Sequence, residues 1–101
     1  MTMKYEMMIL LTEEFNDNEL KTWAFHYAKK LRKLNASEIS VISKGKRDLA
    51  YSIKNQNRGN FIQINFSSLP KNINVFSKSL ILDSNVLRYL VLNKNSVSKN
   101  L

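Results

Sequence analysis

The sequence predicts one small α+β domain in which four strands and two helices follow in the order β-α-β-β-α-β. Apolar residues alternate along four segments, as they do in strands, and recur every three or four residues along two others, as they do in helices. The length of 101 residues allows one hydrophobic core, and an apolar content of 44% can fill it. This order is typical of a four-stranded antiparallel sheet with two helices on one face.

The first strand and the first helix are expected within residues 3–34. Residues 3–11 are apolar on both faces beyond Glu6, which is typical of a central strand. Asn16 and Glu19 have the spacing of a capping box, so the helix is expected to begin there. Its apolar stripe consists of Leu20, Trp23, Ala24, Tyr27, Ala28, Leu31 and Leu34. Phe25 and His26 fall off this stripe and are expected at the surface.

Three further strands and a second helix are expected in the rest of the chain. Residues 37–46 form a β-branched strand that resumes at 49–53 after an irregularity near Gly45. Residues 55–59 hold no apolar side chain and predict a turn, which is followed by a strand at 61–66. Pro70 suits the first turn of the second helix, and Asp83 ends it. With a last strand at 86–92, residues 1–94 make one ferredoxin-like sandwich, and residues 95–101 make a short flexible tail.

The chain carries an excess of positive charge. It has 16 Lys+Arg against 8 Asp+Glu, a net charge of +8, and most of the excess follows residue 20. Such a balance suits either ordinary solubility or a polyanionic partner such as RNA or DNA. With no cysteine and a single histidine, the chain offers no thiolate metal site and little material for catalysis. We therefore expect no enzymatic activity, no metal or other cofactor, no small-molecule substrate and no segment that spans a membrane.

One segment partly matches the signature of an RNA-recognition motif, in which aromatic rings on an open sheet face stack on RNA bases. The segment is Arg58-Gly59-Asn60-Phe61. The positions that would carry the rings hold Asn60 and Ile62, and Phe61 is expected on the opposite face. Because neither Asn nor Ile can stack on a base, we expect contact with the RNA backbone rather than base stacking.

A second set of motifs spans residues 3 to about 94. The set consists of Lys4-Tyr5-Glu6, the run Gly45-Lys46-Arg47-Asp48-Leu49-Ala50-Tyr51-Ser52-Ile53 followed by Gly59-Asn60-Phe61, and Asn85-Val86-Leu87-Arg88. Together these motifs resemble the family of the bacterial-type small-subunit ribosomal protein number six. The resemblance implies a ferredoxin-like domain without catalytic activity. It also implies a heterodimer with small-subunit ribosomal protein number eighteen that binds the central domain of the small-subunit rRNA.

The resemblance and the positions of the cations suggest a set of rRNA-binding residues, since rRNA is held largely through its phosphates and sugars. The expected set is Lys4, Tyr5, Lys44, Lys46, Arg47, Arg58, Arg88 and Lys94. Lys4, Tyr5, Arg47 and Arg88 match family positions directly. The chain departs from the family pattern at Asp48 and Leu87, which are often basic, and at Ser52, which is often proline. Tyr51 is expected to pack against the sheet or the helices.

Two functions remain open from the residues. One is a structural protein of the small ribosomal subunit, and the alternative is a non-catalytic ferredoxin-like interaction or regulatory module outside the ribosome. The start of the chain lacks the features of a signal peptide, so we expect the protein to act where it is made. Richness in asparagine and lysine favours a plastid (chloroplast) stroma, with a bacterial cytoplasm as the alternative.

Overall fold

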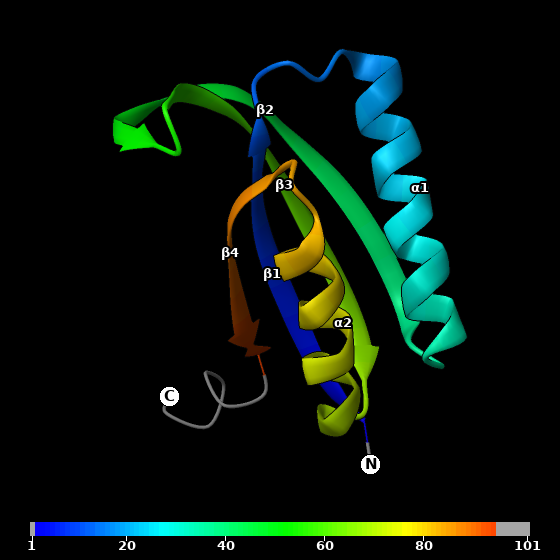
Figure 1. Ribbon diagram of the computed structural model, residues 1–101. Coiled ribbons are helices and arrows are strands. Elements are labelled where there is room, and N and C mark those ends of the chain that lie inside the picture. Colours follow the sequence, from blue (N-terminus) through cyan, green and yellow to red (C-terminus); the bar gives the residue numbers. More distant parts are fainter. Residues whose placement is uncertain (1, 95–101) are drawn as a thin grey trace.

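Four strands and two helices alternate along the chain as the sequence predicts (Figure 1). The computed structural model describes residues 2–94. The elements are β1 (Met3–Thr12), α1 (Asp17–Lys33), β2 (Ser37–Ile53), β3 (Gln56–Ser68), α2 (Pro70–Leu82) and β4 (Val86–Asn93). The tail expected at residues 95–101 lies outside the described residues.

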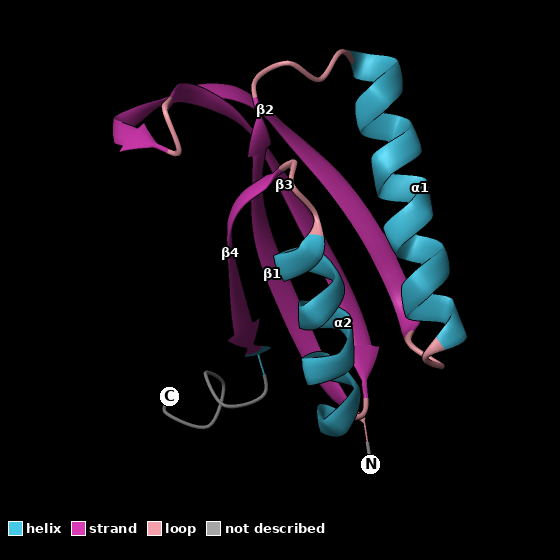
Figure 2. Cartoon of the chain, in the orientation of Figure 1, coloured by secondary structure: helices cyan, strands magenta, loops and turns pink. Residues whose placement is uncertain are grey.

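The sheet is antiparallel throughout, and its strand order is β2-β3-β1-β4. β1 is therefore a central strand, as its two apolar faces predict. Both helices pack on one face of the sheet, and no described element covers the other face (Figure 2). This arrangement confirms the ferredoxin-like sandwich. One face of the sheet builds the core, and the open face is available for a partner.

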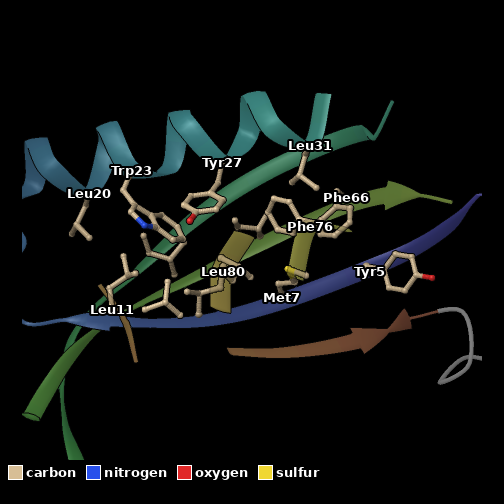
Figure 3. Close-up of a cluster of buried hydrophobic side chains, with 14 residues drawn as sticks. Tyr5, Met7, Leu11, Leu20, Trp23, Tyr27, Leu31, Phe66, Phe76 and Leu80 are labelled. Carbon is tan, nitrogen blue, oxygen red and sulfur yellow. The ribbon is translucent and has the colours of Figure 1, made fainter. Parts of the chain in front are cut away.

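The core lies between the helices and the sheet, and alternate strand positions build its floor (Figure 3). Met7, Ile9 and Leu11 of β1 have exposed fractions of 0%. The buried residues that the two helices contribute are Leu20, Trp23, Tyr27, Leu31, Phe76 and Leu80. The predicted stripe of α1 is confirmed, because each of its large residues up to Leu31 faces the sheet.

The ends of the helices follow local sequence signals. The Asn16 side chain accepts a hydrogen bond from the Glu19 N–H at 2.8 Å, and the Glu19 carboxylate accepts one from the Asn16 N–H at 3.0 Å. This reciprocal pair is the predicted capping box. α2 begins at Pro70, and Asp83 is its C-cap. The Asp83 carboxylate accepts hydrogen bonds from the Trp23 indole N–H and the Tyr27 hydroxyl, at 2.9 and 2.8 Å, so it also ties α2 to α1.

The turn between β2 and β3 is shorter than the sequence predicts, and the prediction of a turn over residues 55–59 is wrong. The turn is Lys54–Asn55, with φ of 49° and 65°, and β3 already begins at Gln56, which pairs with Ile53. Left-handed conformations at both central residues characterise the tight hairpin turn that matches strand twist. The polar run therefore marks strands with both faces in solvent, and the hairpin projects beyond the rest of the sheet (Figure 1).

The predicted irregularity near Gly45 is a bulge. Ser43 pairs with Ile62 and Gly45 pairs with Phe61, so Lys44 is an extra residue in β2. Gly45 has a φ of 88°, a region that glycine enters without steric cost. Because one residue more or less moves every later side chain to the other face, this bulge sets the face on which Arg47 lies.

Gly59, at the base of the hairpin, is expected to tolerate no side chain. A Cβ there would overlap Leu10 Cδ1 and lie 2.8 Å from the Leu11 carbonyl oxygen. We expect Gly59→Ala to lower the free energy of unfolding by about 1–3 kcal/mol through overpacking. Gly45→Ala meets open space and carries only the cost of its positive φ, about 1 kcal/mol. Urea unfolding measures both, and a Gly59→Ala variant as stable as the wild type would contradict the expectation.

Candidate nucleic-acid interface

The eight residues expected to contact rRNA lie at two opposite ends of the sheet. Lys44, Lys46, Arg47, Arg58 and Arg88 lie at the hairpin end, and Lys4, Tyr5 and Lys94 lie at the other end. The register shows the separation, because Arg88 lies opposite Leu10 near the end of β1 and Lys4 lies opposite Ser67 near its start. At the rise of a β-strand, the two ends are roughly 20 Å apart. The structure therefore does not bring all these residues into one compact site.

The hairpin end is strongly basic. We define the hairpin-end surface as Lys44, Lys46, Arg47, Tyr51, Lys54, Arg58 and Arg88. It holds six cationic side chains, and Asp48 is the one acid in the same segments of β2, β3 and β4. Asp48 Oδ1 pairs with Arg58 Nε at 2.9 Å, and both side chains are largely exposed. One cation is thus neutralised and five remain, which produces the positive potential that attracts a polyanion.

Tyr51 and Lys54 are part of this surface, and the sequence-based reasoning missed both. Tyr51 is 64% exposed, so the expectation that it packs against the sheet or the helices is wrong. Arg88 Nη1 donates a hydrogen bond to the Tyr51 hydroxyl at 3.4 Å, and Lys54 Nζ donates one to the Val86 carbonyl at 3.4 Å. These contacts link the hairpin to the start of β4. The signal that could have predicted the longer hairpin is Asn55, because asparagine tolerates the positive φ that a tight two-residue turn requires.

The centre of the open face carries Phe61 in place of the expected Asn60 and Ile62. Ile62 is 1% exposed in the core, and Asn60 is 3% exposed, with its amide donating to the Thr12 carbonyl at 2.8 Å. The assignment of these two positions to the open face was wrong, because Ile62 belongs to the alternating buried set that must face the helices. Phe61 lies opposite Leu10. The two side chains line a small hollow together with Met8, Arg88, Tyr89 and Leu90.

Apolar side chains surround this hollow. We define the open-face patch as Met8, Ile42, Phe61, Leu90 and Leu92. Leu90 is 56% exposed, Ile42 is 41% exposed and Leu92 is 37% exposed, whereas Met8 and Phe61 are half-buried. Exposed apolar side chains that share one face of a sheet are typical of a protein–protein contact. The open face thus divides into an apolar centre and a cationic end.

The end of the sheet opposite the hairpin has mixed charge. Lys94 Nζ pairs with Glu6 Oε1 at 3.5 Å, and Glu38 accepts a hydrogen bond from the Ser67 hydroxyl at 3.1 Å in the same region. Tyr5 is 7% exposed, and its ring packs against Phe66 at a centroid distance of 5.8 Å, while its hydroxyl points away from the buried cluster (Figure 3). The Tyr5 ring is therefore part of the core. This end is less suited to a polyanion than the hairpin end.

No three His, Asp or Glu side chains among residues 2–94 form a group that could hold a metal ion. Over the same residues, neither helix is long and apolar enough to cross a bilayer. The fold and these surfaces define a ferredoxin-like domain whose open sheet has an apolar centre and a cationic end.

Comparison with known proteins identifies the family. The model of the family "Ribosomal protein S6" matches residues 4–93, which is nearly the whole described chain. The chain belongs to the ribosomal protein S6 family of the small ribosomal subunit. The members of this family are structural ribosomal proteins and not enzymes. The family expected from the motifs is thus confirmed.

Similar proteins come from plastids and from bacteria. The chain is 77% identical to small ribosomal subunit protein bS6c, the plastid form, of Trieres chinensis, over 92% of this chain and 97% of that protein. It is 67% identical to bS6c of Phaeodactylum tricornutum, over 90% and 93%, and 32% identical to bS6 of Trichormus variabilis, over 98% and 91%. The crystal structure of 30S ribosomal protein S6 from Thermotoga maritima superimposes with a TM-score of 0.87 at 20% identity, over 99% and 94% of the two chains. That likeness shows the same fold.

Proposed function

We propose that this chain is a structural protein of a plastid small ribosomal subunit that binds small-subunit rRNA together with ribosomal protein number eighteen. The observation that supports RNA binding most directly is the hairpin-end surface, where six cationic side chains gather with a single acid. Lys and Arg neutralise RNA phosphates and release condensed counterions, which supplies most of such affinity. The identity of the bS6c relatives, at 77% and 67%, supports the plastid.

The geometry of the two arginines suits backbone contact. Arg88 lies on the edge strand β4 with its guanidinium beside the Tyr51 hydroxyl, and Arg47 lies on the other edge strand β2, opposite Gly59. Three inter-strand spacings separate these strands, about 14 Å. At this separation of the backbones, we propose that each guanidinium binds its own phosphate group. A guanidinium is suited to this role because its planar donors match a phosphate in a bidentate fork.

The open-face patch is the proposed contact with the partner protein. Its centre carries Phe61 and Met8, residue types that are enriched in the cores of protein interfaces, and Leu90 is 56% exposed beside them. The hairpin-end surface borders this patch, since Arg88 contributes to the same hollow as Phe61. A partner docked there reaches the same RNA. This adjacency accounts for RNA binding by a pair of proteins.

The RNA-binding role is tested by the double variant Arg47→Gln/Arg88→Gln. With a fragment of the central domain of small-subunit rRNA in the presence of the partner, we expect the affinity to fall about tenfold at 0.15 M salt. The slope of log K against log salt is expected to decrease by about 1–2, because two phosphate contacts are lost. The matched control is Lys71→Gln/Lys78→Gln, which removes the same charge from exposed positions on α2. Equal losses in the two double variants would reduce the effect to net charge and contradict the assignment.

The partner half of the proposal has its own readout in the same titrations. Wild-type affinity for the rRNA fragment is expected to rise when ribosomal protein number eighteen is added. Leu90→Gln places an uncharged polar side chain in the open-face patch and is expected to abolish this increase. Because the variant changes no charge beside Arg88, the affinity without partner is expected to stay unchanged. An increase that survives in Leu90→Gln would exclude the patch as the docking site. Recovery of the chain outside small ribosomal subunits, after sedimentation of plastid extract, would contradict the ribosomal role itself.

A further inference from the structure

The outer face of α1 carries an aromatic ring among cations. We define the outer α1 surface as Phe25, His26, Lys29, Arg32 and Lys33. All five are exposed and lie on the side of the helix opposite the buried stripe. Phe25 is 62% exposed, and Lys29 Nζ lies 5.4 Å from the centroid of its ring. Among residues 2–94, no other aromatic ring packs against it.

The positive charge of this surface is not balanced on the helix. After Glu19, α1 contains no acid up to its end at Lys33, whereas exposed helix faces commonly pair Glu with Lys four residues apart. The salt bridges among the described residues involve none of the three cations Lys29, Arg32 and Lys33. Lys30 differs from these three. Its Nζ atom lies 5.0 Å from the centroid of the Tyr27 ring, and its charge helps to lower the pKa of Asp83. The helix dipole favours cations in the last turn, but it does not explain an exposed ring among them.

We propose that the outer α1 surface binds a second segment of rRNA, with an unstacked base on Phe25 and phosphates on Lys29, Arg32 and Lys33. Alternating aromatic and basic side chains are how proteins hold single-stranded RNA, since every base can stack on a ring. The RNA bound here is a loop or a single strand. In a regular duplex the bases are stacked on one another, so no base face is accessible to the Phe25 ring.

The outer α1 surface and the open face of the sheet lie on opposite sides of the domain. α1 covers the face of the sheet opposite the open face, which carries Arg47 and Arg88 (Figures 1 and 2). Arg47 and Arg88 therefore point away from the outer α1 surface, and we expect different RNA segments to contact the two sides. The protein would hold two rRNA segments apart at the thickness of the domain. This second contact goes beyond the proposed function, which requires only the hairpin end.

The absence of cysteine allows a direct test, because a single introduced cysteine can carry a tethered Fe(II)–EDTA group that cleaves nearby RNA. Three single-cysteine variants are compared in reconstituted small subunits: Thr22→Cys beside Phe25, Ser52→Cys in the hairpin and Lys78→Cys on α2. We expect Thr22→Cys and Ser52→Cys to cleave two different sets of rRNA nucleotides, and Lys78→Cys to add no comparable set. If only Ser52→Cys cleaves rRNA, the proposed function stays intact and this inference is overturned. The same result is expected if a protein rather than RNA covers α1.

Affinity measurements separate the ring from the charge. With the loop sequence identified by cleavage, Phe25→Leu is expected to weaken binding about fivefold or more, and Phe25→Tyr to retain it, because only the ring supports stacking. Lys29→Gln/Lys33→Gln is expected to weaken binding about tenfold at 0.15 M salt, relative to Lys71→Gln/Lys78→Gln. Equal affinities for Phe25→Leu and Phe25→Tyr would overturn the stacking role. Thermal unfolding checks that these exposed substitutions leave the fold unchanged.

Discussion

Phe76→Ala is expected to lower the free energy of unfolding by about 3–5 kcal/mol. Phe76 is 1% exposed, and its ring packs edge-on against Tyr27 and also against Phe66 (Figure 3). The distances between the ring centroids are 5.8 and 6.1 Å. Replacement by alanine removes a large apolar surface and leaves a cavity that the rigid sheet beneath cannot fill. Domains of this size are stable by about 5–15 kcal/mol in total, so the variant is expected to lose a large share of its stability.

The measurement is equilibrium unfolding in urea at neutral pH, followed by the fluorescence of Trp23, the single tryptophan. Val75→Ala, at the neighbouring position of α2, is the control, because Val75 is 53% exposed and its loss is expected to cost less than 1 kcal/mol. A loss below 1 kcal/mol in Phe76→Ala would show that the core closes around the missing ring. The folded fraction of the variant is expected to bind RNA normally, since Phe76 lies away from both proposed surfaces.

Asp83→Ala is expected to lower the free energy of unfolding by about 2–4 kcal/mol. Its Oδ2 atom accepts two hydrogen bonds from the core side of α1, from the Trp23 indole N–H at 2.9 Å and the Tyr27 hydroxyl at 2.8 Å. Hydrogen bonds to a charged acceptor contribute about 1.5–3 kcal/mol each. Removal of the carboxylate takes this acceptor away from two donors that belong to buried residues. Asp83 Oδ1 also accepts a hydrogen bond from the Asn85 N–H at 2.9 Å, so the variant loses a contact in the turn that follows α2.

The same carboxylate gives the protein an acid-dependent stability. Burial by itself would raise the pKa of Asp83, but hydrogen bonds from the Asn85 backbone N–H, the Tyr27 hydroxyl and the Trp23 indole, with the charge of Lys30, lower it below 3.8. The opposite effect appears on Tyr27, whose pKa is raised by burial and by the hydrogen bond to Asp83 and its charge. Because the folded form of Asp83 binds its proton more weakly than the unfolded form, its contribution is complete above about pH 4. It is lost as the pH falls through the folded pKa.

Urea unfolding between pH 7 and pH 2 is expected to show this difference. The stability of the wild type should fall more steeply below about pH 4 than that of Asp83→Asn, which has no proton to bind there. Asp48→Asn is the control, because the ion pair of Asp48 with Arg58 is exposed and contributes less than about 1 kcal/mol. If Asp83→Asn and the wild type lost stability in parallel, the acid dependence would have to come from other carboxylates.

Much of this fold could be predicted from local sequence signals. The capping box of Asn16 and Glu19, the apolar stripe of α1 and the alternation of β1 each depend on residues a few positions apart, so they can be recognised without knowing the fold. The bulge at Gly45 was also visible, because glycine interrupts an otherwise β-branched run. The element order then left few arrangements that could bury the apolar faces.

The site was less predictable, because it depends on residues far apart in the sequence. The sequence identified the basic residues but could not show that Arg88 meets Tyr51 while Lys94 pairs with Glu6 at the other end. It also misplaced Phe61, although the alternation of the buried Ile62, Ile64 and Phe66 along β3 places that ring on the open face.

By itself, the sequence determined the elements, the sign of the charge and the family. The tertiary structure decided which charges act together and which rings are exposed. Propensity and periodicity act over one or two turns of chain, whereas a surface is assembled by strand order, by register and by the length of a hairpin. For this protein, the two-residue turn at Lys54–Asn55 lengthens the hairpin enough to place Tyr51 and Arg88 together.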